Sequence, residues 1–205
     1  MTDRAAYVGG MSRRRASVVL VLLTGLALTG CAAPAQAPET SAVETPAPEA
    51  GAEFSPAAGD TITAEQYTLT LPDGWGFPDG APEGFDETTF AADLTIEDGY
   101  RDNVNILVSP GGEVTSEQVE EAGVAQLEEA GASDVQALDR VTAAGSESAH
   151  LTARVDQGGT PYVIDQFYLV NAGQTYIVTF ASDAEKPQAE RDALAQSVLV
   201  TWQWV

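Results

Sequence analysis

The sequence predicts an α+β domain over residues 60–205, in which helices pack against an antiparallel sheet. Three observations predict it. Several short segments alternate apolar and polar residues, which is the period of a half-buried strand. Two longer segments carry the apolar spacing and the end signals of helices. The strand segments come in runs between the helices, and this order favours an antiparallel sheet covered by helices.

The first strands lie on either side of a long loop. Residues 67–71 alternate apolar and polar side chains and end at the turn Pro72-Asp73-Gly74. A loop rich in Gly and Pro follows over residues 75–87. Strands are predicted at 90–96 and 103–108. The loop exceeds about 12 residues, a length at which loops in compact domains are often functional.

The first helix is predicted by its ends. Thr115 and Gln118 form a capping-box pattern, Glu117 suits the positive end of the helix dipole, and Gly131 is placed to end the helix. One mostly apolar face is shared by Val119, Ala122, Gly123, Gln126, Leu127 and Ala130.

Strands resume after this helix, at residues 135–141, 150–155, 162–170 and 174–181. The strand at 162–170 has apolar residues on both faces, which predicts a central strand covered on both sides. A second helix is predicted at about 184–198, with Pro187 in its first turn. The aromatic tail Trp202-Gln203-Trp204 is predicted to dock on the sheet.

Residues 67–75, with the sequence YTLTLPDGW, resemble the strand–Leu-Pro-x-Gly-Trp opening of the Mog1/PsbP-like superfamily, which includes actinobacterial lipoproteins of the LpqN/LpqT kind. Residues 103–106, the mid-chain helix and residues 175–180 are similar in the same order, so the likeness covers most of residues 66–200. The resemblance implies an α/β/α sandwich around a mainly antiparallel sheet. It implies no catalytic residues.

Residues 1–30 have the features of a secretory signal peptide. Arg13-Arg14-Arg15 precedes the apolar residues 16–28, which are too few for a membrane span of about 20 residues. Leu28-Thr29-Gly30-Cys31 resembles the bacterial lipobox. That resemblance implies cleavage between Gly30 and Cys31 and a diacylglycerol on the Cys31 thiol. The alternatives are an ordinary signal peptide with an incidental cysteine and a buried free cysteine at position 31. The chain starts at either Met1 or Met11.

Residues 31–59 are predicted to be the lipidated cysteine and a disordered tether. They contain five prolines, four glutamates, no basic residue and Phe54 as the only aromatic residue. Such a composition buries too little apolar surface to offset the entropy of ordering, and its prolines favour extended chain. The tether would hold the domain away from a membrane surface.

The charge of the domain restricts its partners. Residues 60–205 contain 26 acidic and 5 basic residues, a formal charge of −21. This balance argues against nucleic-acid binding, which needs clustered Lys and Arg, and it repels anionic lipid headgroups. The covalent lipid on Cys31 is therefore the predicted membrane contact, and the predicted location is the extracytoplasmic face of the cell membrane.

Cysteine and histidine, on which many enzymes and metal sites depend, are scarce in the chain. One cysteine and one histidine exclude an intrachain disulfide and a Cys-rich zinc site. Ser148, Asp156 and Asp165 form no recognisable triad motif with His150, which is interpreted as an ordinary strand histidine. The acidic residues of the 75–87 loop lack EF-hand spacing. No enzyme activity, cofactor or metal site is predicted.

The remaining candidate site is aromatic. Trp75, Phe77 and Phe85 lie in a loop that also carries acidic residues, which suits an apolar contact rimmed by negative charge. Trp75, which follows a Pro-x-Gly turn, is alternatively a core residue. The predicted function is a non-enzymatic binding or scaffolding module of the cell envelope with an envelope protein or lipid as partner. The alternative is a carrier of a small apolar ligand such as an envelope lipid.

Overall fold

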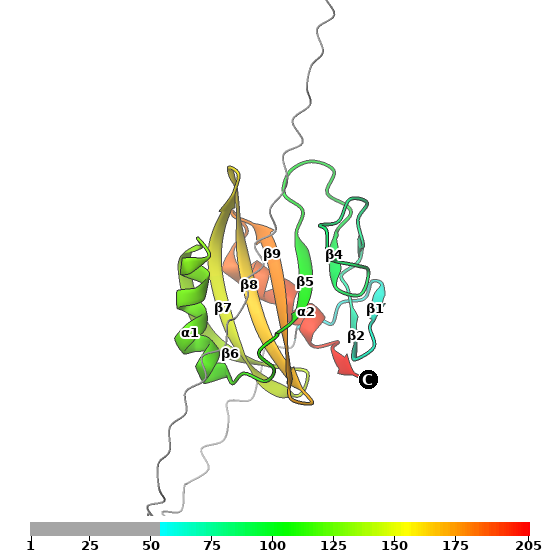
Figure 1. Cartoon of the computed structure of the whole chain (residues 1–205). Helices are drawn as coiled ribbons and strands as arrows, with labels where there is room; N and C mark the ends of the chain where they lie inside the picture. Colours follow the sequence, from blue (N-terminus) through cyan, green and yellow to red (C-terminus); the bar gives the residue numbers. More distant parts are fainter. Residues whose placement is uncertain (1–53) are drawn as a thin grey trace, which may run out of the picture.

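The computed structural model describes residues 54–205 (Figure 1). The predicted signal peptide, Cys31 and the tether as far as residue 53 lie outside the described residues. The elements in chain order are β1 (Thr61–Thr63), β2 (Tyr67–Thr70), β3 (Trp75–Gly76), β4 (Phe90–Asp93), β5 (Asn103–Val108), α1 (Ser116–Glu129), β6 (Ser133–Ala143), β7 (Ser146–Gln157), β8 (Thr160–Asn171), β9 (Gln174–Asp183), α2 (Gln188–Leu199) and β10 (Gln203–Trp204).

The sheets confirm the predicted fold class. Seven strands form the main sheet in the order β3-β4-β5-β9-β8-β7-β6, and β1, β2 and β10 form a small second sheet. All neighbouring strands in both sheets are antiparallel. Figure 1 shows α1 on one side of the main sheet and α2 across the other side. The molecule is therefore an α/β/α sandwich around an antiparallel sheet.

Strand β8 has both of its faces covered, as its sequence predicts. It lies between β7 and β9. Phe167 and Leu169 belong to the core cluster that includes Ala195, Val198 and Leu199 of α2. The alternate residues Ile164 and Tyr168 pack in the second cluster with Val119 and Leu127 of α1. The period of two along β8 thus assigns successive side chains to two separate cores.

Helix α1 has the predicted ends and a narrower buried face than predicted. The Thr115 hydroxyl accepts a hydrogen bond from Gln118 N–H, and the Gln118 side chain accepts one from Thr115 N–H. Gly131 follows with φ of 94°, the left-handed conformation that ends many helices. Ala122 and Ala130 of the predicted apolar face are exposed, because the sheet contacts a stripe consisting of Val119, Gly123 and Leu127.

Helix α2 begins later than its sequence suggests. The predicted start was near residue 184, but the helix spans Gln188–Leu199 and Pro187 is the N-cap, with extended backbone. A residue before proline is driven out of the helical region, so the helix cannot include Lys186. Residues 183–186 instead form a turn in which Lys186 N–H donates to the Asp183 carbonyl.

The C-terminal tail docks as predicted, on the smaller sheet. The pairing of β10 with β2 places Trp204 opposite Tyr67. Trp202 is buried and stacks on Tyr67, with ring centroids 4.4 Å apart. The short strand β1 was not predicted, since three residues carry too little periodicity. It is held by backbone pairing with β2.

Residues 54–59 contact the domain, although they belong to the segment predicted as tether. Ala57 N–H donates to the Ser197 carbonyl at the end of α2, and Gly59 N–H donates to the Leu71 carbonyl, both at 2.8 Å. Between residues 54 and 205, neither helix has the length and apolarity needed to cross a membrane.

Candidate functional site

The predicted aromatic site is dispersed by the fold. Trp75 is only 6% exposed and belongs to the core, because β3 pairs with β4 and turns the indole inward. Phe85 is partly buried, with its ring centroid 5.5 Å from that of Phe90. Phe77 is 42% exposed. Of the three predicted contact residues, Phe77 is therefore the one that presents its ring to solvent.

The far end of the 75–87 loop is fixed by hydrogen bonds to Asp86. Its carboxylate accepts from Thr88 N–H at 2.9 Å, from the Thr88 hydroxyl at 2.7 Å and from the Thr89 hydroxyl at 3.0 Å. These bonds, the Thr88 hydroxyl foremost, lower the pKa of Asp86. Tyr67 of β2 donates its hydroxyl to the Thr88 carbonyl at 2.6 Å. The end of the loop is therefore held against the core, and the Asp86 carboxylate is occupied by hydrogen bonds within the protein.

A second group of chemically active side chains lies beneath α2, which we call the α2 network. It consists of His150 and Thr152 of β7, Asp165 of β8, and Arg191 and Asp192 of α2. The register of β7 and β8 places Thr152 opposite Asp165. The strands therefore supply one side of the network, and the first half of α2 supplies the other.

Asp165 is the centre of the α2 network. It is 1% exposed, Arg191 Nε donates to its Oδ2 at 2.8 Å, and His150 Nε2 lies 3.3 Å from its Oδ1. Burial acts to raise the pKa of this carboxyl, but hydrogen bonds from His150 and Arg191 and the Arg191 charge outweigh it and lower the pKa. Asp165 is therefore an ionised carboxylate inside the protein, with Arg191 as its counter-charge.

Asp192 lies at the edge of the same network. Its side chain is half-buried, and its Oδ1 atom is shielded from solvent without a hydrogen-bond partner among the described residues. Burial raises the pKa of Asp192, and the nearby Asp165 charge adds to the effect, while His150, Arg191 and a hydrogen bond from the Gln188 side chain to the carboxyl oppose it. A buried carboxylate oxygen without a donor is costly, so this atom is a candidate to receive a proton or a cation.

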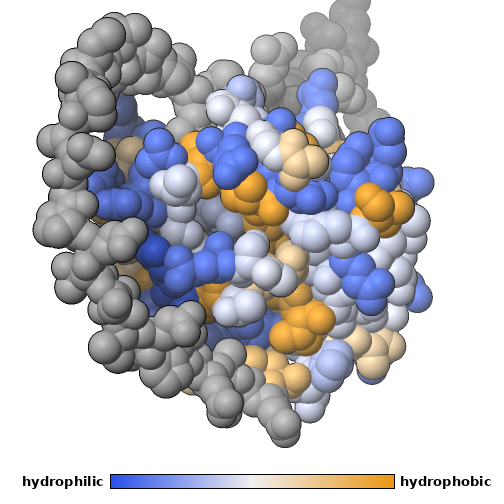
Figure 2. All heavy atoms as spheres, turned by 90° about the horizontal axis from the view of Figure 1, so that it is seen from below, coloured by the Kyte–Doolittle hydropathy of each residue, from blue (hydrophilic) through white to orange (hydrophobic). Residues whose placement is uncertain are grey.

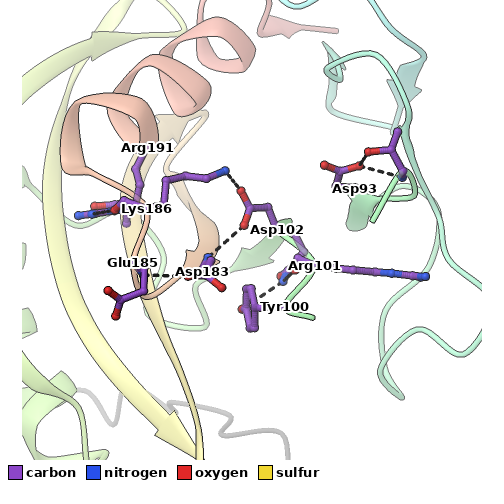
Figure 3. Close-up of polar contacts among 11 residues, drawn as sticks. Asp93, Tyr100, Arg101, Asp102, Asp183, Glu185, Lys186 and Arg191 are labelled. Atoms are coloured by element: carbon purple, nitrogen blue, oxygen red, sulfur yellow. Dashed lines mark hydrogen bonds and ion pairs between the residues drawn. The ribbon is translucent and has the colours of Figure 1, made fainter. Parts of the chain in front are cut away.

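A neighbouring ion pair fixes the start of α2 (Figure 3). Lys186 pairs with Asp102, and the other Asp102 oxygen accepts from Asp183 N–H at 3.0 Å. Arg191 Nη1 donates to the Lys186 carbonyl at 3.0 Å, which connects this pair to the α2 network. Lys186 and Arg191, two of the five basic residues of the domain, therefore both stabilise the turn that precedes α2.

Sequence reasoning named His150 and Asp165 but missed their partners Arg191 and Asp192. The partners come from an element 26 or more residues further along the chain. A signal was present: basic residues are rare in this acidic domain, and Lys186 and Arg191 stand five positions apart at the start of a predicted helix. When the few basic residues of an acidic domain stand together at one helix end, they indicate that buried carboxylates lie nearby.

One face of the surface is visible in Figure 2, at the end of the molecule where the C-terminus lies. Apolar side chains lie there in separate groups between hydrophilic ones, and they do not form one broad patch. This view therefore shows no broad apolar patch of the kind that marks a large docking surface.

No protein-family model and no curated protein sequence matches the chain. Solved structures with a related arrangement each match 68% of it. A Bacteroides thetaiotaomicron protein is 15% identical, with a TM-score of 0.39, and the match spans 45% of that chain. LpqN, involved in cell envelope biogenesis of Mycobacterium tuberculosis, is 12% identical, with a TM-score of 0.47 and 83% of its chain covered. The cyanobacterial PsbP of Synechocystis is 20% identical, with a TM-score of 0.39 and 86% of its chain covered.

LpqN and PsbP are of the kinds that the sequence resembles. At these identities and TM-scores, the function has to be argued from the residues of this chain.

Proposed function

We propose that the chain is a lipid-anchored protein of the extracytoplasmic membrane face whose domain binds an envelope protein without catalysing a reaction. Cys31 carries the lipid, the following residues act as a spacer, and the 75–87 loop makes the contact. The anchor rests on the basic, apolar and lipobox-like segments in residues 13–31.

The observation that carries the binding role is the exposure of Phe77. A phenylalanine that is 42% exposed, in a loop whose other aromatic residues are buried or half-buried, has apolar surface left to bury against a partner. Acidic residues follow it at positions 79 and 83. The loop therefore suits a partner with an apolar depression and basic residues around it.

The arrangement of the charged residues supports a non-catalytic role. Arg191 and His150 both contact Asp165, and Lys186 pairs with Asp102, so these side chains stabilise the domain's own interior. A general base needs access to the proton that it removes. Asp165, which is almost fully buried, has no such access.

The test is Phe77→Ala in the full chain, expressed in its own host, with crosslinking of intact cells and identification of captured proteins. Val200→Ala is the matched control, because Val200 is a similarly exposed apolar residue at the end of α2. We expect Phe77→Ala to lose the captured partner while its melting temperature stays close to that of the wild type. Val200→Ala should keep both.

Capture of the same protein by the wild type and Phe77→Ala at equal yield would overturn the role of the loop. If the substitution instead removed a co-purifying lipid and left protein capture unchanged, the domain would be a carrier of apolar ligands and the proposal would be wrong.

A further inference from the structure

We propose that His150, Asp165 and Asp192 form a binding site for a first-row divalent metal ion, such as Zn²⁺, beneath α2. The proposal is independent of the partner-binding role of the 75–87 loop. It rests on the spacing of three potential ligand atoms, on an unpartnered carboxylate oxygen and on the groups that surround them.

The spacing of the ligand atoms fits one metal ion. Tetrahedral bonds of about 2.0–2.1 Å place two ligand atoms about 3.3–3.4 Å apart. His150 Nε2 and Asp165 Oδ1 are 3.3 Å apart, and potential ligand atoms from all three residues lie within 4.8 Å of one another. Rotation of the Asp192 side chain towards His150 would complete a three-ligand set with a fourth position open to water.

The Asp192 Oδ1 atom supplies the independent reason to expect a cation. It is shielded from solvent and has no hydrogen-bond partner among residues 54–205. Asp165 and Asp192 bring two carboxylates to the network, and Arg191 brings one permanent positive charge. A divalent cation between the carboxylates would change the sum of these formal charges from −1 to +1, so the reason to expect it is the unpartnered Oδ1 atom, to which it would give a ligand role.

The groups around Asp165 and His150 hold both side chains in place, as is usual for metal ligands. Arg191 Nε holds Asp165 through Oδ2, the oxygen that is not needed for the metal, and its Nη2 lies 3.4 Å from the Thr152 hydroxyl. Carboxylate ligands in metal sites are commonly oriented by such second hydrogen bonds. The His150 ring is fixed by stacking on Phe167, with centroids 4.3 Å apart.

The donor set determines the class of metal. One imidazole nitrogen and two carboxylate oxygens suit Zn²⁺ and its first-row neighbours, whereas Ca²⁺ and Mg²⁺ prefer sites made entirely of oxygen. Binding through Nε2 requires the His150 proton to reside on Nδ1. A bound metal ion would replace the Nε2 contact to Asp165, which at 3.3 Å is longer than most N–H···O hydrogen bonds.

The experiment uses the full chain, purified in detergent without a histidine tag and treated with EDTA, which is then removed. His150 is the only histidine of the chain, so its ring signals in an NMR spectrum are unambiguous. Zn²⁺ is titrated in an excess of Mg²⁺, which occupies weak sites on exposed carboxylates. Asp192→Asn is the test variant, and Glu190→Gln, an exposed carboxylate on the same helix, is the matched control.

We expect one Zn²⁺ per chain, a shift of the His150 ring signals that is complete at one equivalent, and tetrahedral absorption when Co²⁺ replaces Zn²⁺. Asp192→Asn should weaken Zn²⁺ binding at least tenfold, and Glu190→Gln should leave it unchanged. Unshifted His150 signals in the wild type, or equal Zn²⁺ affinity of the wild type and Asp192→Asn, would overturn the site. Zn²⁺ that is fully displaced by Mg²⁺ would also overturn it.

Discussion

Arg191 and Asp165 form a buried ion pair whose side chains are 10% and 1% exposed. Such a pair contributes little net stability compared with apolar residues of the same shape, because both charges lose their hydration. Removal of one partner is different, since it leaves the other charge buried and uncompensated. By contrast, Arg140 contacts Glu120 at 2.6 Å and Glu147 at 2.7 Å on the surface, where water screens all three groups.

We therefore expect Arg191→Met to reduce the free energy of unfolding by about 3–5 kcal/mol at neutral pH. Urea unfolding in the presence of EDTA measures this loss without a contribution from bound metal. Arg140→Met, which also removes an arginine with two side-chain contacts, should cause a much smaller loss. The double variant Asp165→Asn/Arg191→Met should recover part of the stability. If it is no more stable than Arg191→Met, an uncompensated Asp165 charge is not the cause.

The sequence does not reveal which of the loop aromatics are exposed, nor which residues lie next to His150. Phe77, Phe85 and Trp75 stand in one loop with similar surroundings in the sequence, yet pairing of β3 with β4 buries Trp75 and a contact with Phe90 partly buries Phe85. Their exposure is decided by residues distant in sequence. His150 has no sequence neighbour that marks it as a ligand, because its partners are supplied by β8 and α2.

At the level of elements, helix α1 packs unusually close to β7 at one residue. A Cβ atom on Gly123 would lie 2.6 Å from Leu151 Cδ1 and 3.5 Å from Val119 Cγ1. Leu151 is fully buried, so it has little room to move away. Glycine is therefore required at position 123 for packing, although it disfavours the helix by about 1 kcal/mol relative to alanine.

We expect Gly123→Ala to lower the free energy of unfolding by about 1 kcal/mol, because overpacking outweighs the gain in helix propensity. Thermal or urea unfolding measures it. Ala125→Gly, at an exposed position on the same helix, gives the propensity effect alone. In a Leu151→Val background, the loss caused by Gly123→Ala should shrink, since the clashing methyl is gone. An increase in stability with Gly123→Ala alone would contradict the close approach of helix and sheet.

The long strands and α1 were predictable because their residues repeat the same burial pattern over many positions. In β8 and β9, alternate side chains enter two cores, and in α1 the capping box and Gly131 mark both ends. The sequence does not predict the start of β7, because residues 146–149 carry no clear alternation. They are paired with β6 from Ala143 and Ser146 onwards, after a turn with Ala144 and Gly145 in left-handed conformation.

At the scale of the whole molecule, charge is unevenly distributed. Four of the nine basic residues precede residue 16, and removal of residues 1–30 would leave a chain with a formal charge of −25. Such a chain is repelled by anionic headgroups and has no electrostatic means of staying at a membrane. We propose that the lipid predicted on Cys31 attaches the protein to the membrane.

The proposed location therefore depends on Cys31. Acyl chains contribute about 0.8 kcal/mol for each buried methylene, so two chains on the Cys31 thiol give stable attachment. We expect Cys31→Ala to leave the precursor uncut or to release the protein from the membrane fraction. Thr29→Ala, at the variable position of the lipobox-like tetrapeptide, should be processed and retained like the wild type. Cell fractionation and the intact mass of the product measure both. Normal cleavage and unchanged membrane retention of Cys31→Ala would show that another part of the chain provides the attachment.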